Sequence, residues 1–207
     1  MNEKIILSRE FFVGNGIERE CYIHSLDITK VIKIERLNNR KTNRNQNSLD
    51  YKYFKFLEKQ KIPLTHIPKC YGYVNTNLGN GLVFDRVYDY DGKNSISFLK
   101  VIIENKLSKG TQDRLLEELR RYLFKYNILF VDVALHNVLC CEYEKNKYRL
   151  IIIDGLGAKR IGIKFWLYLR LKLFTRYKII KSWKKFLKRY NKKQNIKIYM
   201  EKRWIKM

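Results

Sequence analysis

Three oxygen-bearing side chains lie in an otherwise apolar part of the second half of the sequence. Asp132 and Asn137 are separated by four residues in FVDVALHNVLC, and Asp154 follows 17 residues later, at the end of the run LIII. Phosphoryl transfer needs a carboxylate near the acceptor hydroxyl and oxygen ligands for the magnesium ion that bridges the nucleotide phosphates. Asp132 would supply the carboxylate, and Asn137 and Asp154 the metal ligands. Gly155 would let the backbone turn sharply beside the metal.

The D-x4-N spacing is not specific by itself, because Asp89 and Asn94 repeat it. The surroundings of Asp132 are more informative, since an amphipathic helix is predicted before it and apolar strands are predicted after it. The alternative for Asp154 and its glycine is an ordinary turn at the end of a strand. His136, in the same segment, is interpreted as a loop histidine.

The first third of the chain carries residues suited to binding the phosphates of a nucleotide. Gly14 and Gly16 end one predicted strand, where bare backbone can approach phosphate closely. Lys33 lies inside the apolar strand KVIKIER, where its charge costs desolvation energy unless it is paired. Asp50 on the following helix is the best placed partner, and Glu58 is the second. The alternatives are an ordinary hairpin turn for VGNG and a solvated strand face for the lysine.

Positioning these residues requires a sheet, helices and two loops. Period-two runs of β-branched and aromatic residues predict five strands over residues 4–16, 17–24, 29–37, 67–77 and 81–92. One helix over 49–60, with Ser48 as a possible N-cap, is inserted among them. Two more helices are predicted over 97–107 and 111–127, followed by a charged hairpin tip at 141–149. The predicted segments are a sheet lobe (1–92), the core of a second lobe (93–160) and a basic, aromatic helical tail (161–207).

The charge is concentrated in that tail. The chain has a net charge of +24, and residues 159–207 contain 18 lysines and arginines against one acid, Glu201. Apolar residues make up 45% of the chain, enough to fill the core of a folded domain. A basic and apolar tail suits a polyanionic surface, such as phospholipid head groups, acidic glycolipid or nucleic acid.

Other features narrow the class of protein. The four cysteines show no spacing typical of a zinc site and are expected to be free thiols. No window reaches the roughly 18 uncharged residues that a membrane span needs, and the N-terminus has no long apolar segment. We therefore expect a cytoplasmic protein that meets a membrane only from the surface, at its inner face.

The order of the features resembles the protein-kinase fold: Gly-x-Gly, strand lysine, helix acid, D-x4-N and strand-Asp-Gly. More narrowly, residues 8–160 resemble the YrbL family, the "PhoP regulatory network protein" group of bacterial kinase-like proteins. The stretches that carry this match are VGNGIERECYIH with VIKI, DYKYFKFL, HIPKCYGYVNTNLGNGLVFDRVYDYDGKNSIS, NVLC and IIIDGLGA. More distantly, the arrangement is similar to small kinases that phosphorylate sugars of the lipopolysaccharide core.

The resemblance implies an α+β, two-lobed, protein-kinase-like fold with a small antiparallel sheet lobe and a minimal, mostly helical second lobe. It implies an ATP-dependent phosphotransferase that uses Mg2+ and acts on a sugar hydroxyl of a lipopolysaccharide-type acceptor. The residue roles carried over are phosphate binding by Lys33 with Gly14 and Gly16, helix acid for Asp50, base for Asp132, metal ligands for Asn137 and Asp154, and an adenine-facing hinge from Asp85 to Val87.

Several kinase features are absent from the sequence. Phe130 and Val131 stand where protein kinases have His-Arg, the phenylalanine of the DFG motif is missing, and no APE-like segment follows. Activation-loop control and a full platform for protein substrates are therefore not expected. The alternative function is a non-catalytic kinase-like regulator in a bacterial envelope-stress network.

The tail alternates large apolar groups with cations, and the apolar residues fall near helical spacing: Phe165, Trp166, Leu169, Leu173, Ile180, Trp183 and Leu187. Two interpretations stay open, namely two helices that complete the second lobe, or the same helices resting also on anionic membrane or glycolipid. Specific nucleic-acid binding is not expected, because no recognition motif accompanies the charge.

Overall fold

The structure is a computed structural model that describes residues 4–36, 46–158, 160 and 162–204, with side chains up to residue 196. The chain divides after Val87 into two compact units, which we call the N-terminal and C-terminal units. Strands and helices occur in both, which confirms the predicted α+β class.

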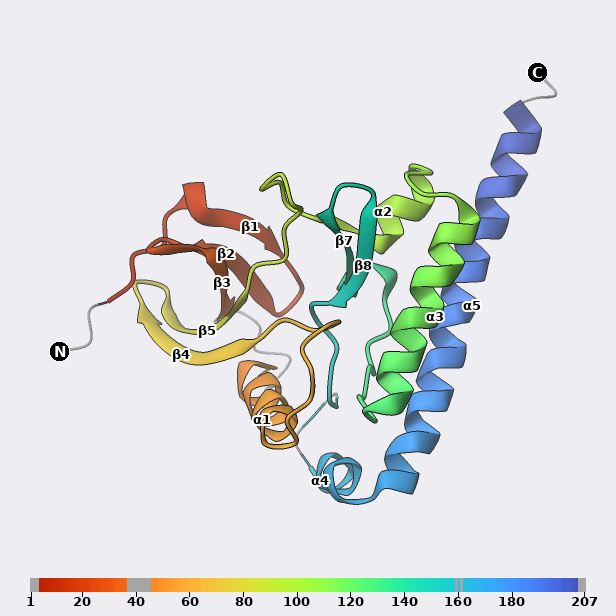
Figure 1. The fold of residues 1–207 in the computed structure, drawn as a ribbon. Helices are drawn as coiled ribbons and strands as arrows, with labels where there is room; N and C mark the ends of the chain where they lie inside the picture. Colours follow the sequence, from red (N-terminus) through yellow and green to blue (C-terminus); the bar gives the residue numbers. More distant parts are fainter. Residues whose placement is uncertain (1–3, 37–45, 159, 161, 205–207) are drawn as a thin grey trace. The chain divides into compact units, whose positions relative to one another are not determined.

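The N-terminal unit contains a five-stranded antiparallel sheet with the strand order β1-β2-β3-β5-β4 (Figure 1). Its elements are a 3-10 turn at Arg9–Phe11, β1 Phe12–Asn15, β2 Arg19–His24, β3 Asp27–Glu35, α1 Gln46–Lys59, β4 Cys70–Thr76 and β5 Gly79–Asp85. The predicted count of five strands and one helix is confirmed. Two predicted strands were too long, because the first contains the 3-10 turn and the last ends at Asp85.

Alternation along β3 assigns its side chains to two faces of the sheet. Ile32 and Ile34 pack on one face with Ile5 and Leu7 from the start of the chain. The opposite face carries Lys33 and faces α1, as shown by the ring contact between Phe54 of α1 and Phe84 of β5 at 5.2 Å and by the hydrogen bonds described below. The polar candidates of this unit therefore lie on the face toward α1.

Helix α1 begins earlier than the sequence suggested. It includes Gln46, so Ser48 lies inside the first turn and the prediction of Ser48 as N-cap is wrong. The amide of Asn47 donates to the Glu35 carboxylate of β3 at 2.7 Å. A carboxylate from a neighbouring strand thus satisfies an N–H of the first turn, which helices otherwise leave for a capping side chain.

The C-terminal unit combines a small sheet of order β6-β7-β8 with helices. Its elements are β6 Ile96–Ser97, α2 Phe98–Ile103, α3 Lys109–Lys125, a 3-10 turn at Leu135–Asn137, β7 Val138–Glu144, β8 Lys147–Ile152, α4 Ile163–Arg170 and α5 Lys172–Trp204. Ser97 and Ser108 cap α2 and α3, each accepting a hydrogen bond from a first-turn amide at 3.2 Å. Helices α3 and α5 run side by side (Figure 1).

The two predicted tail helices are confirmed as α4 and α5, but the apolar residues divide differently from the prediction. Phe165 and Trp183 are buried, whereas Trp166, Leu173 and Ile180 are exposed. The buried side of α5 consists of Thr175, Ile179, Ser182, Trp183, Phe186, Tyr190 and Gln194. None of the helices in the described part of the chain has the length and apolar character needed to cross a bilayer.

Candidate functional site

The segment after α3 is held against the segment after β8 by backbone hydrogen bonds. The amides of Val131 and Asp132 both donate to the carbonyl of Gly155, at 2.8 and 3.1 Å. One residue further out, Phe130 and Leu156 form an antiparallel bridge. These contacts bring the D-x4-N segment and the Asp-Gly turn together within the C-terminal unit, although 17 residues separate Asn137 from Asp154 in sequence.

Asn137 is buried and its side-chain amide is clamped onto Asp132. Nδ2 donates to the backbone carbonyl of Asp132 at 2.9 Å and to its carboxylate oxygen Oδ2 at 3.1 Å. Because the NH2 end is engaged, the Oδ1 end of the amide is oriented as an oxygen ligand. The Asn137 carbonyl accepts from Ile153 at 2.9 Å, which ties the turn to the end of β8.

Gly155 cannot carry a side chain in this arrangement. Its φ is +80°, in the left-handed region that favours glycine. A Cβ atom built on it would lie 2.7 Å from the Asp132 carbonyl oxygen, 2.8 Å from the Asp132 Cβ and 3.2 Å from Asn137 Nδ2. The glycine therefore allows the segment after β8 to lie against the segment that carries Asp132 and Asn137.

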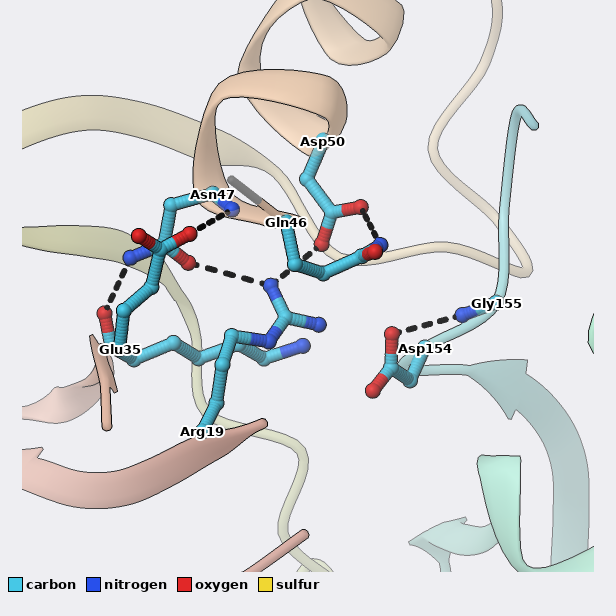
Figure 2. Close-up of polar contacts among 8 residues, drawn as sticks. Arg19, Glu35, Gln46, Asn47, Asp50, Asp154 and Gly155 are labelled. Carbon is cyan, nitrogen blue, oxygen red and sulfur yellow. Dashed lines mark hydrogen bonds and ion pairs between the residues drawn. The ribbon is translucent and has the colours of Figure 1, made fainter. Parts of the chain in front are cut away.

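Asp154 is half-buried and lies directly before this glycine. Its Oδ1 accepts a hydrogen bond from the Gly155 amide at 2.7 Å, drawn in Figure 2. This local bond orients the carboxylate while the glycine bends the chain. Asp132, in contrast, is exposed, so a hydroxyl group can reach its carboxylate.

The oxygen donors of the C-terminal unit fit a hard cation such as Mg2+. Asn137 Oδ1 and the carboxylates of Asp154 and Asp132 are the ligand types that Mg2+ prefers, and Mg2+ sites commonly use only one or two carboxylates. Within the residues that the structure describes, no three His, Cys, Asp or Glu side chains gather in one place.

Asp50 of α1 forms a buried ion pair with Arg19 of β2. Arg19 Nη1 lies 2.7 Å from Asp50 Oδ2, and the two side chains are only 7% and 4% exposed. The same Nη1 donates to Asn47 Oδ1 at 3.1 Å, and Gln46 donates to Asp50 Oδ1 at 2.9 Å (Figure 2). The helix acid is thus held by a guanidinium that the sequence interpretation did not include.

Lys33 lies in the middle of β3, opposite Cys21 of β2 and Leu82 of β5. Its ammonium group is 4.7 Å from the centre of the Phe84 ring, within cation–π range. Burial raises the pKa of the nearby Cys70 thiol, and the charge of Asp50 raises it further, while that of Lys33 lowers it. Asn47 connects β3 to α1, because its Nδ2 donates to the Lys33 carbonyl at 2.9 Å.

The two glycines of VGNG occupy the hairpin between β1 and β2. Gly14 pairs with Cys21 next to an irregularity in the register, and the Gly16 amide closes the turn on the Arg19 carbonyl at 2.8 Å. Neither glycine has a φ in the left-handed region, and a Cβ would meet nothing closer than 3.8 Å at either position. The fold of this unit does not itself require glycine at these two positions.

The predicted hinge residues run from the last residue of β5 to the end of the N-terminal unit. Asp85 is anchored to β4, since its carboxylate accepts from the Lys69 amide at 2.9 Å and from the Tyr71 hydroxyl at 2.8 Å. The Arg86 amide donates to the Thr29 carbonyl at 2.8 Å, and Val87 ends the unit.

Sequence reasoning missed Arg19, Asn47 and Glu35, the polar residues that connect β2, β3 and α1. The available signal was the alternation of IERECYIH, which places Arg19 and Cys21 on one face of the strand. Which face becomes buried depends on pairing with β3, where Arg19 lies opposite Glu35. The four cysteines are free, as predicted.

Comparison with known proteins supports the predicted relationship. The family described as "PhoP regulatory network protein YrbL" matches residues 5–191. The chain is 27% identical over 159 residues to "Uncharacterized protein YrbL" of Escherichia coli (strain K12). The aligned residues make up 76% of this chain and 75% of that protein. The protein of the same description from Shigella flexneri matches with the same identity and coverage. The chain therefore belongs to the YrbL family of PhoP regulatory network proteins.

Proposed function

We propose that the chain is a kinase-like phosphotransferase that uses Mg-ATP. The observation that carries the proposal is the clamp of Asn137 on Asp132, closed over Gly155 next to Asp154. A carboxylate, an amide oxygen and an Asp-Gly turn in this order and contact are the parts that protein kinases use for their base and metal ligands.

The N-terminal unit supports the same proposal. Protein kinases carry a phosphate-binding lysine on the third strand and its acidic partner on the following helix. Lys33 on β3 and Asp50 on α1 follow that order, and Gly14 and Gly16 lie on the hairpin where the kinase pattern has its phosphate-covering glycines. In this proposal Lys33 and the hairpin backbone bind phosphate, and the backbone from Asp85 to Val87 binds adenine.

The proposed chemistry is transfer of the γ-phosphoryl group to a hydroxyl. The acceptor oxygen forms a bond to phosphorus, the bond to the ADP oxygen breaks, and the hydroxyl proton passes to Asp132. Asn137 holds the Asp132 carboxylate in place through its Nδ2, so that the base is oriented before the acceptor arrives. Mg2+, held by Asn137 and Asp154, would neutralise charge on the transferred group. A sugar hydroxyl of a lipopolysaccharide-type glycolipid is the proposed acceptor, on the basis of the resemblance to the core sugar kinases.

Thermal unfolding with ATP, with and without Mg2+, tests the nucleotide site. A ligand that binds only the folded protein, at about 100 times its dissociation constant, adds about 2.7 kcal/mol of stability. We expect a Mg2+-dependent rise in Tm for the wild type and for the control Asp91→Ala, in an exposed turn, and no rise for Asp154→Ala. Absence of a rise in every protein would refute the proposal.

A second function, a nucleotide-binding regulator without catalysis, is favoured by two observations. Phe130 and Val131 replace the residues that precede the base in protein kinases, and the family description names a regulatory network. ATP turnover by Asp132→Asn separates the two functions. A phosphotransferase should lose at least about 100-fold in rate, the scale of a missing general base. Absence of turnover in both the wild type and Asp132→Asn, together with intact ATP binding, would instead support the regulator.

A further inference from the structure

Large apolar side chains are exposed in one short stretch of the C-terminal unit. Ile163 is 81% exposed and Leu173 is 87% exposed, although both lie within helices. The full set between residues 163 and 180 is Ile163, Trp166, Leu171, Leu173, Phe174, Tyr177 and Ile180. Exposed apolar residues elsewhere in the described chain are mostly more scattered, which is usual for proteins. We call the exposed side chains of this set the α4–α5 surface.

The α4–α5 surface is held by a well-packed junction between the two helices. Phe165 of α4 is fully buried, and the hydroxyl of Thr175 in α5 donates to the carbonyls of Tyr168 and Leu171. The rings of Tyr168 and Phe174 stack with their centres 5.0 Å apart. The exposure of the apolar side chains is therefore part of the folded structure and not a result of unpacked helices.

Helix α5 has a second side apart from the one that packs into the unit. Leu173, Tyr177 and Ile180 recur at helical spacing, offset from the buried side that contains Thr175 and Ile179. The same stripe continues in steps of four residues as Lys184 and Lys188, which are both exposed. An apolar end of the helix thus passes into a basic one.

The charges on the segment that carries the α4–α5 surface have one sign. No aspartate or glutamate occurs between Asp154 and Glu201. Lysines and arginines lie among the apolar residues instead, at Lys164, Arg170, Lys172, Arg176, Lys178 and Lys181. A partner that complements this surface therefore carries negative charge for the cations and an apolar region for the exposed apolar side chains.

We propose that the α4–α5 surface binds the face of an anionic phospholipid bilayer, with its apolar side chains in the interfacial layer and its cations at the head groups. Amphipathic helices with Trp and Leu on one side and lysines beside them bind membranes in this way. Nucleic acid fits this surface less well, because its phosphate backbone offers no apolar environment in which Ile163 and Leu173 could be buried. A second copy of the chain fits less well too, because the cations would face cations. This binding is independent of the proposed phosphotransfer, since none of the site residues takes part.

Co-sedimentation of the full chain with vesicles tests the proposal. We expect binding to vesicles of phosphatidylcholine with about 30% phosphatidylglycerol and little binding to phosphatidylcholine alone, with partitioning that falls as salt rises. Each lysine near an anionic surface raises the partition coefficient about fivefold. The variant that combines Lys181→Gln, Lys184→Gln and Lys188→Gln should therefore bind vesicles on the order of 100-fold more weakly. Ile163→Ser with Leu173→Ser should reduce it by about tenfold or more.

Matched controls are available in the same chain. Lys52→Gln, Lys59→Gln and Lys145→Gln remove three exposed lysines elsewhere, and Leu26→Ser removes an exposed leucine in the N-terminal unit. These variants should bind vesicles as the wild type does. In a Trp204→Phe background, Trp166 fluorescence should shift to the blue on binding, and Trp166→Phe should abolish the shift.

Three outcomes would overturn the proposal. Failure to bind either kind of vesicle at low salt leaves the surface without a lipid partner. The second is that a short DNA duplex displaces the protein fully from vesicles and binds Leu173→Ser as well as the wild type. That result would make nucleic acid the partner of the basic residues. Self-association in the absence of vesicles, lost in Ile163→Ser with Leu173→Ser, would make the surface an interface between copies.

Discussion

Gly155 illustrates how a single residue determines the geometry of the candidate site. Its left-handed φ and its close approach to Asp132 are separate constraints. Together they explain why an Asp-Gly pair, and not Asp154 alone, follows the apolar strand. The residue that matters for shape is thus next to the one proposed for chemistry.

Gly155→Ala should destabilise the protein more than Gly92→Ala does. Gly92 has a similar φ of +83°, but a Cβ there would meet nothing within 4 Å. Both substitutions incur the left-handed penalty of about 1–2 kcal/mol, and only Gly155→Ala adds overlap with the Asp132 backbone. Urea unfolding measures both values, and equal losses would contradict the described packing.

Cys140 predicts a specific dependence of stability on pH. Burial in β7 raises the pKa of its thiol to about 12 from the ordinary value of 9.0. The folded state therefore keeps a proton that the unfolded state releases, so this contribution is complete below pH 9 and is lost as pH rises toward 12. The slope for one proton is at most about 1.4 kcal/mol per pH unit.

Cys140→Ala should remove that dependence. The cavity that the substitution leaves lowers the free energy of unfolding by an amount that does not vary with pH. The difference in free energy of unfolding between wild type and variant should therefore shrink from pH 9 to pH 11. Urea unfolding at several pH values measures the difference. A constant difference would show that the thiol titrates alike in both states.

At the scale of elements, the ion pair between Arg19 and Asp50 joins β2 to α1. Removing one partner of a buried pair leaves an uncompensated charge, which costs about 3–5 kcal/mol, whereas replacing both by apolar groups is often neutral. Arg19→Met and Asp50→Leu should each be strongly destabilising, and the double variant should recover most of the loss. The test is a double-mutant cycle of unfolding free energies.

The contrast for this cycle is an exposed pair on α1. Lys55 and Glu58 are 2.7 Å apart but 49% and 59% exposed. Exposed pairs contribute about 0–1 kcal/mol, so the corresponding cycle should give a small coupling energy. Additive losses at Arg19 and Asp50 would show that their pairing does not stabilise the unit.

At the scale of the whole molecule, the net charge of +24 should make stability increase with salt. Repulsion among cations opposes the compact state, and raising ionic strength from about 0.01 to 0.1 M shortens the Debye length from about 30 to 10 Å. Tm should rise by about 2–4 °C for each kcal/mol of repulsion that is relieved. The rise should be smaller for Lys181→Gln, Lys184→Gln and Lys188→Gln together. A Tm that falls with salt would instead show that attraction within surface ion pairs contributes more to stability than repulsion among the excess cations.

The sequence alone determined the order of elements and the place of the candidate residues along it. Alternation and helical periodicity are local properties, so five strands, α1, α3 and the β7–β8 hairpin could be predicted. Likewise, Asp132, Asn137 and Asp154 could be selected because their polar side chains interrupt apolar runs. The family relationship also followed from motifs that are contiguous in sequence.

Only the tertiary structure decided which of these residues meet. Asp50 is paired with Arg19, 31 residues away, because strand register and the entry of α1 bring them together. Apolar periodicity did not separate Trp183, which is buried, from Leu173, which is exposed, since helix α5 carries apolar residues on two sides. Contacts between distant segments depend on packing against neighbouring elements, and the spacing of residues along one element does not contain that information.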